Sequence, residues 1–412
     1  MRKEQITFSF MYNVFLIFTL IFPLWVNSYS VLGIRYKFIT INFPLLLFLI
    51  GISGIILNAL NKLHTLHFRI KNINLIDLLI VINILWNIIA LILANDFQSY
   101  RNYYLYSFPF YYYLIVRLLN TKCYYSNVLI YWGILVAILG IVEYITRFNP
   151  FLPPKVIYKG FYYMYNRVQG YQPSVVFDGP NTLGLFLNSV SLLLLYRRKR
   201  FFEFSYVSKF FILIIGSIIS LSRVNLIGVS IILILFIKNF NIKYKKVFII
   251  IIVLLLIMLV IVFIYPHFKS RLLDIKTALD RPQLWKKCLR ILYANNILLG
   301  IGYDKLRDTK YLGSPAHNSF LNILVEQGFV GVIIWFLMWY FIFYRLKKDY
   351  TYSQTAKFLI WFGVLYHIVG LFHSAIFMYK VRMLYFIILG NFINRKKPII
   401  IYHHHEIYSI NK

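Results

Sequence analysis

Long apolar runs recur along the whole 412-residue chain, and they constrain its fold more than any other feature. Most hold roughly 15–23 residues, close to the length that an α-helix needs to cross a bilayer. The apolar share of the chain, 60%, is far above that of a soluble domain. We therefore predict an all-α integral membrane protein with roughly twelve transmembrane helices, at Phe8–Val26, Phe38–Leu60, Leu75–Ala94, Tyr103–Leu119, Asn127–Ile145, Thr182–Tyr196, Phe210–Ser222, Val224–Ile237, Val247–Tyr265, Phe329–Tyr344, Ala356–Phe377 and Met383–Ile393.

Lysine and arginine residues gather between the apolar runs and give the chain a net charge of +31. The basic clusters at 197–200 and 395–397 are typical of cytoplasmic loops, which carry an excess of positive charge. We predict both termini on the cytoplasmic side, with the basic loops attracted to anionic membrane lipids. A charge of this size could also indicate nucleic-acid binding, but its placement beside membrane spans favours lipid headgroups, so no nucleic-acid partner is expected.

Two extracytoplasmic loops are predicted within what is otherwise a single polytopic membrane domain over 1–412. The first, 146–180, is polar and aromatic and contains several prolines. The second, 266–328, is the longest. Cys123 and Cys288 fall on opposite sides of the membrane in this topology, so they cannot pair, and no metal-ligand spacing is present.

A short amphipathic helix is expected within the long loop. Asp280 can cap its start, with Gln283 reaching back in a variant capping box and Pro282 in the first turn. An apolar face on this helix would lie on the membrane surface, formed by Trp285, Cys288, Leu289 and Leu292.

A histidine stands in the stretch 314–331, where the long loop meets a strongly apolar run. Asn318 or Ser319 can cap a short helix that ends near Gly328. His317 would then lie at the positive end of this helix, where a protonated imidazole is disfavoured. A neutral imidazole facing an aqueous cavity is a candidate general base. The alternative is an interfacial histidine with no chemical role.

Arg223 interrupts what would otherwise be one continuous apolar stretch. An arginine in or near a membrane needs a partner or a water-filled cavity, although it can also extend its charge to the lipid headgroups. Asn181 begins the sixth predicted span, where it can cap the helix or contact a substrate. His367 and His373, in the eleventh span, are expected to pack or to face a pore and not to catalyse.

Four partial motifs between Arg167 and Gly331 resemble those of the bacterial O-antigen polymerase and O-antigen ligase superfamily. The most specific is His-Asn-x-x-Leu followed by Glu-x-Gly-x-x-Gly, which begins at His317. The others occur upstream in the expected order: Arg-Val-Gln-Gly at 167–170 with Pro-Asn at 180–181, Ser-x-Ser-Arg at 220–223, and Arg-x-x-x-Trp at 281–285 with Ile-Leu-Leu-Gly-Ile-Gly-Tyr at 297–303.

The resemblance implies glycosyl transfer on the outer face of the bacterial cytoplasmic membrane, without a cofactor or a metal ion. The donor would be an oligosaccharide on a polyprenyl diphosphate, and the acceptor a sugar hydroxyl. Arg223 and Arg281 would bind the leaving diphosphate, because the guanidinium fork meets phosphate oxygens in a bidentate geometry. His317 would take the proton of the acceptor hydroxyl. The residues expected to bind substrate are Arg167, Asn181, Ser222, Asn318 and Glu326.

Two superfamily activities fit these motifs. A polymerase for a surface polysaccharide, such as O-antigen or capsule, joins repeat units that both remain lipid-linked, and a flippase and a chain-length regulator are its possible partners. A ligase moves the finished glycan to lipid A-core. We favour the polymerase. A repeat-unit flippase or other transporter is the alternative from a different class, but transporters tend to show internal repeats and broken helices near the midplane. Here the unusual residues concentrate at one predicted face, beside the longest loop.

Overall fold

The computed structural model describes residues 73–119, 126–146, 177, 179–197, 204–220, 222–239, 276–373, 378–394, 399–403 and 406–410. The predicted spans Phe8–Val26, Phe38–Leu60 and Val247–Tyr265 lie outside these residues, as do most of the first loop and the beginning of the long loop. Arg167 and Cys123 also lie outside the described residues.

The described chain is almost entirely helical, as the apolar runs predict. Its elements are α3 (Leu75–Ala94), α4 (Phe97–Leu119), α5 (Ser126–Thr146), α8 (Pro180–Arg197), α9 (Phe204–Ile219), α10 (Arg223–Asn239), α13 (Lys276–Tyr293), the 3₁₀-helix η5 (Lys305–Arg307), α14 (Ser319–Lys348), α15 (Gln354–Phe372) and α16 (Tyr379–Asn394). Among the described residues, four helices (α3, α5, α14 and α15) are long and apolar enough to cross a membrane. The total of twelve spans stays a prediction.

A β-hairpin follows the last helix, in a tail for which no strand was predicted. Strands β1 (Ile399–His403) and β2 (Glu406–Ile410) pair antiparallel, with Ile399 opposite Ile410. The prediction of an all-α chain is therefore incomplete at the C-terminus, where the isoleucine and tyrosine residues suit a strand.

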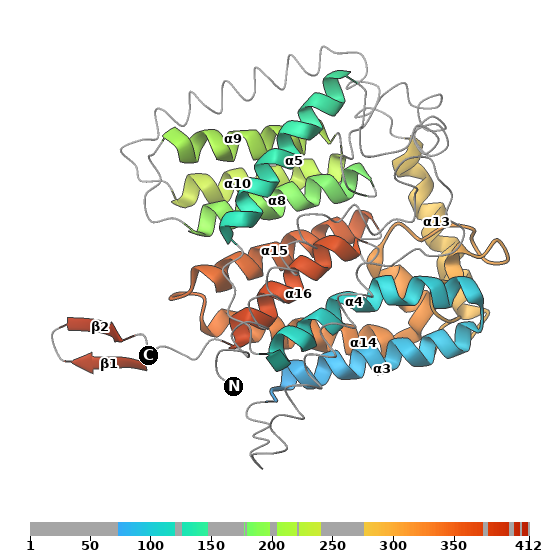
Figure 1. Ribbon diagram of the computed structural model, residues 1–412. Coiled ribbons are helices and arrows are strands. Elements are labelled where there is room, and N and C mark those ends of the chain that lie inside the picture. The colour runs from blue at the N-terminus through green and yellow to red at the C-terminus, as the bar shows by residue number, and fades with distance from the viewer. Residues whose placement is uncertain are drawn as a thin grey trace, which may run out of the picture.

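Two groups of helices pack on either side of α15 (Figure 1). In one group, α4 packs against α3 and α16, and α14 packs against α3. In the other, α8 contacts α5, α9 and α10. Helix α15 joins the groups because it contacts α8 and α10 on one side and α14 and α16 on the other.

A largely buried ion pair explains how α4 accommodates the charge of Arg117. Arg117 binds both carboxylate oxygens of Asp77 on α3, at 2.9 and 2.7 Å, and also donates to Asn394 on α16. Tyr113 donates to the same carboxylate at 2.6 Å. A bidentate pair with further hydrogen bonds satisfies both charges inside the bundle, so it ties α3, α4 and α16 together. Helix α4 also continues through Pro109.

Helix α13 begins earlier than the sequence predicts. It starts at Lys276, so Pro282 lies inside the helix and Asp280 is not its N-cap. The predicted capping box is wrong, because the helix continues through Pro282 and Asp280 lies inside it. Of the predicted apolar face, Cys288 and Leu292 are buried inside the protein, and Leu289 is exposed.

At one end of the bundle, the ends of helices that are far apart in sequence lie close together. The start of α8 contacts the residue before α10 and the residue after α15, through Asn181, Ser222 and His373. The opposite helix ends carry basic residues in their last turns, namely Arg197 on α8, Lys238 on α10 and Arg345, Lys347 and Lys348 on α14. This distribution fits an orientation with those basic turns in the cytoplasm.

Cysteine labelling tests this orientation. In a background where Cys123 and Cys288 are replaced by serine, a cysteine at Lys310 should react with an impermeant maleimide in intact spheroplasts. A cysteine at Lys347 should react only after the membrane is permeabilised. Both lysines are exposed, so access depends on the side of the membrane and not on burial. Labelling at 347 but not at 310 in intact spheroplasts would reverse the topology.

Candidate active site

The loop between α13 and α14 folds back as a strand-like segment against the first part of α14. The amides of Ile301 and Gly302 donate to the carbonyls of Val325 and Glu326 at 2.9 and 3.0 Å. In return, the amide of Phe329 donates to the carbonyl of Ile297 at 3.0 Å. These backbone contacts hold the loop across α14 and open the helix at Gly328, where the backbone leaves the helical conformation.

Glycines permit this close approach of two backbones. Gly300 and Gly328 have φ angles of 77° and 67°, and Gly328 has a ψ of −172°, a combination that is essentially restricted to glycine. A β-carbon on Gly300 would lie 2.6 Å from the carbonyl carbon of Glu326, and one on Gly328 would overlap the carbonyl of Leu298. The predicted end of the short helix near Gly328 is thus confirmed as a kink within one longer helix.

Replacing Gly328 with alanine should destabilise the protein and abolish most activity. The backbone conformation alone costs an alanine about 1–3 kcal/mol, and the clash with Leu298 adds to that cost. Thermal unfolding of the detergent-solubilised protein measures the effect. Gly313→Ala is a matched control because Gly313 also has a positive φ, of 70°, but has open space around it. Equal falls in unfolding temperature for the two variants would contradict the steric argument.

Glu326 lies beneath this loop. Its side chain is buried, and its carboxylate accepts from the amide of Leu306 at 3.4 Å. Arg307 forms an ion pair with the neighbouring buried Asp304 at 3.1 Å. Glu326 therefore contacts the loop itself. Its role in binding substrate stays a prediction.

Hydrogen bonds to the backbone amide and carbonyl of Ala316 fix the chain directly before His317. The amide of Ala316 donates to the side chain of Asn322 at 2.7 Å, and its carbonyl accepts from the indole of Trp285 at 3.1 Å. His317 itself has a φ of 54°, unusual for a residue with a side chain. Turns of this kind recur at functional sites, where the surrounding structure holds the strained residue in place.

Asn318 is the N-cap of α14, one of the two residues predicted for that position. Its side-chain oxygen accepts from the amides of Phe320 and Leu321, at 2.9 and 3.0 Å. Its amide nitrogen donates to the carbonyl of Leu371 at 3.0 Å, which ties the start of α14 to the end of α15. The loop carrying His317 is therefore anchored on both sides.

His317 is neutral in this environment, although the main causes are not the predicted helix end. Burial lowers its pKa from the ordinary value of 6.5, and the nearby positive charges of Arg281 and Arg307 lower it further. Burial also lowers the pKa of Arg281, and the guanidinium of Arg223 adds to this effect. Arg281 on α13 therefore lies close enough to Arg223 on α10 and to His317 in the loop before α14 for electrostatic interaction with each of them.

A second histidine completes this cluster. The ring of His373, at the C-cap of α15, stacks on that of His317 with centroids 5.9 Å apart and planes at 29°. The imidazole of His373 also lies within electrostatic reach of Arg281. This residue was expected to pack or to face a pore, because nothing in its local sequence distinguishes it from His367. His367 does pack, with its ring centre 4.4 Å from that of Trp339.

Asn181 links His373 to the start of α10. Its side-chain oxygen accepts from the hydroxyl of Ser222, and its side-chain nitrogen lies 3.4 Å from Nδ1 of His373. The helix begins at Pro180, with the carbonyl of Gly179 accepting the first helical bonds, so Asn181 is not the N-cap. Of the two roles considered from the sequence, capping is excluded, and the side chain faces the histidine cluster.

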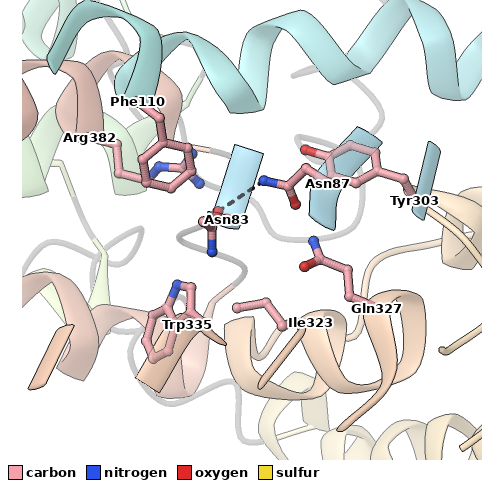
Figure 2. A pocket seen from close by; sticks show the side chains of 8 residues that line it. All are labelled: Asn83, Asn87, Phe110, Tyr303, Ile323, Gln327, Trp335 and Arg382. Atoms are coloured by element: carbon pink, nitrogen blue, oxygen red, sulfur yellow. Dashed lines mark hydrogen bonds between the residues drawn. The ribbon is translucent and has the colours of Figure 1, made fainter. Parts of the chain in front are cut away.

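A separate polar pocket lies between α3, α4, α14 and α16 (Figure 2). Within it, Asn87 donates to Asn83 at 3.0 Å, and the guanidinium of Arg382 lies 5.1 Å from the ring centre of Phe110. The pocket has room for about one water molecule, so it cannot hold a sugar. Its lining residues are Asn83, Asn87, Phe110, Tyr303, Ile323, Gln327, Trp335 and Arg382.

The apolar helices and the charged cluster at one end of the bundle define a multi-pass membrane protein with a polar site that contains two arginines and two histidines. Residues 209–336 match the model of the family described as O-antigen ligase. This match confirms the resemblance to the O-antigen polymerase and ligase superfamily that the motifs predicted, over this part of the chain. The matched segment contains Arg223, Arg281 and His317. No curated protein gives a significant match to the chain.

Proposed function

We propose that this protein polymerises a surface polysaccharide, transferring glycan from a polyprenyl diphosphate to a sugar hydroxyl of another lipid-linked repeat unit. The observation that supports this proposal best is the convergence of Arg223, Arg281 and His317 from three separate elements. Such a site combines fixed positive charge with a neutral base. Glycosyl transfer from a diphosphate needs both.

The chemistry assigns a distinct role to each group. The acceptor hydroxyl oxygen attacks the anomeric carbon of the donor sugar and loses its proton to His317. The bond from that carbon to the phosphate oxygen breaks, and the electron pair leaves with the diphosphate. Arg223 and Arg281 stabilise the charge that develops on this leaving group. Their mutual repulsion in the free protein is relieved when the anion binds.

The residues around the reacting groups would bind and orient the glycan. Asn181 on α8 accepts from Ser222 before α10, and Asn318 before α14 donates to Leu371 at the end of α15. Arg167 remains a proposed substrate ligand from the motif resemblance alone. We further propose that the site faces the outside of the bacterial cytoplasmic membrane, where a flippase would deliver the lipid-linked units and a chain-length regulator would act on the product.

An assay with purified protein tests the proposal. Lipid-linked repeat units in detergent, with a chelator present, should be converted to longer lipid-linked chains, since neither translocation nor a metal is required. Transfer to an added lipid A-core acceptor, without elongation, would instead establish a ligase. The absence of both reactions with the correct donor would favour a transporter.

A further inference from the structure

His373 has a fixed position in the site but no role in the mechanism above. It lies at the C-cap of α15, beside His317 and within the electrostatic influence of Arg281. Its backbone is also fixed, because the carbonyl of His373 accepts a hydrogen bond from the hydroxyl of Ser319 at 3.3 Å. These contacts place the imidazole beside the proposed base and within electrostatic reach of one of the proposed diphosphate ligands.

The hydrogen bonds of Asn181 determine where His373 carries its proton. The hydroxyl of Ser222 donates to the side-chain oxygen of Asn181, which turns the side-chain nitrogen toward Nδ1 of His373. An amide NH₂ group can only donate, so Nδ1 must accept. A neutral imidazole that accepts at Nδ1 has its hydrogen on Nε2. The chain Ser222–Asn181–His373 thus presents an N–H group of fixed identity.

We propose that His373 is a further catalytic residue, a neutral imidazole that donates a hydrogen bond from Nε2 to an oxygen of the leaving diphosphate. This inference rests on the proposed glycosyl transfer. A neutral donor suits this place because Arg223 and Arg281 already supply two positive charges, and a third cation would repel them. A fixed, directional N–H adds stabilisation where charge develops in the transition state.

The side chains of glutamine and asparagine separate this role from packing. The amide nitrogen of glutamine can replace Nε2 of histidine, whereas that of asparagine reaches only as far as Nδ1. In the elongation assay, His373→Gln should therefore lose less than about tenfold in kcat, and His373→Asn should lose on the order of 10²-fold, the usual effect of removing one such donor. Equal losses in the two variants would indicate a packing role and overturn the proposal.

The linkage through Asn181 has its own test. Asn181→Asp keeps the shape of the side chain but can only accept, so it draws the hydrogen of His373 to Nδ1 and removes the Nε2 donor. Its loss should approach that of His373→Asn, and the double variant should be no worse than either single variant. Full activity of Asn181→Asp would contradict the assigned proton position.

Binding of undecaprenyl diphosphate, measured by titration of the full-length protein, tests His373 independently of transfer. His373→Asn should weaken this binding several-fold, and His373→Gln should weaken it less. His367→Gln, a change of the packing histidine on the same helix, should leave it unchanged. Unaltered affinity in His373→Asn would reject the contact even if transfer is confirmed. If wild type binds the diphosphate but transfers nothing, the proposed function fails and this contact can still be measured.

Discussion

Replacing His317 with alanine should reduce the rate of glycan transfer about 10²–10⁴-fold, the usual contribution of a general base. The loss should be in kcat, because the arginines proposed to bind the diphosphate are retained. The fold should survive, since Ala316 and Asn318 on either side of His317 keep their own anchors. Elongation of purified lipid-linked units measures the rate, and thermal unfolding checks the fold. Undiminished elongation would remove His317 from the mechanism.

The pH dependence gives a second view of the same residue. A base must be unprotonated, and the pKa of His317 is lowered below 6.5 by burial and by Arg281 and Arg307. The value of kcat/KM, which reports on the free enzyme, should therefore be constant through neutral pH and fall only below about pH 6.5. Because Arg281 lowers this pKa, Arg281→Gln should move the acid fall to higher pH as well as reduce the rate. An acid fall above pH 7 in the unmodified protein would contradict the assignment.

Much of the described fold was predictable because membrane spans have a strong local signature. Helices α3 and α5 match the predicted runs to within a few residues, since length and apolar composition alone define them. The start of α4 was missed because Phe97–Asn102 is polar. The ion pair of Arg117 on α4 was not predicted either, because the carboxylate of Asp77 comes from another helix.

The site was predictable where residues act in motifs and hidden where they act through space. Arg223, Arg281 and His317 stand in recognisable patterns, and the fold brings them together. His373 stands in no such pattern. Its proposed role rests on a stacking contact with His317 and a hydrogen-bonding distance to Asn181, which is far away in sequence. These residues are close because several helices end at the same side of the bundle. The local periodicity of the sequence does not predict such an arrangement.

Replacing Arg281 or Arg223 with lysine should lower activity by about 10²–10³-fold, although the formal charge is kept. Lysine cannot offer the planar fork that binds two phosphate oxygens at once. Arg290→Lys is a matched control, because Arg290 lies on the same helix as Arg281 and is exposed. It should retain full activity.

A lysine at position 281 should also respond to pH in a way that arginine does not. Burial and the charge of Arg223 already lower the pKa of Arg281, yet an arginine stays charged because its starting value is so high. A lysine starts near 10.4, so the same burial and repulsion bring its titration closer to neutral pH. The remaining activity of Arg281→Lys should therefore decline as the pH rises from about 7 to 9, while Arg290→Lys follows the wild-type profile. If both Arg281→Lys and Arg223→Lys form polymer of normal length and amount, these arginines do not bind the diphosphate and serve instead as anchors to the lipid headgroups.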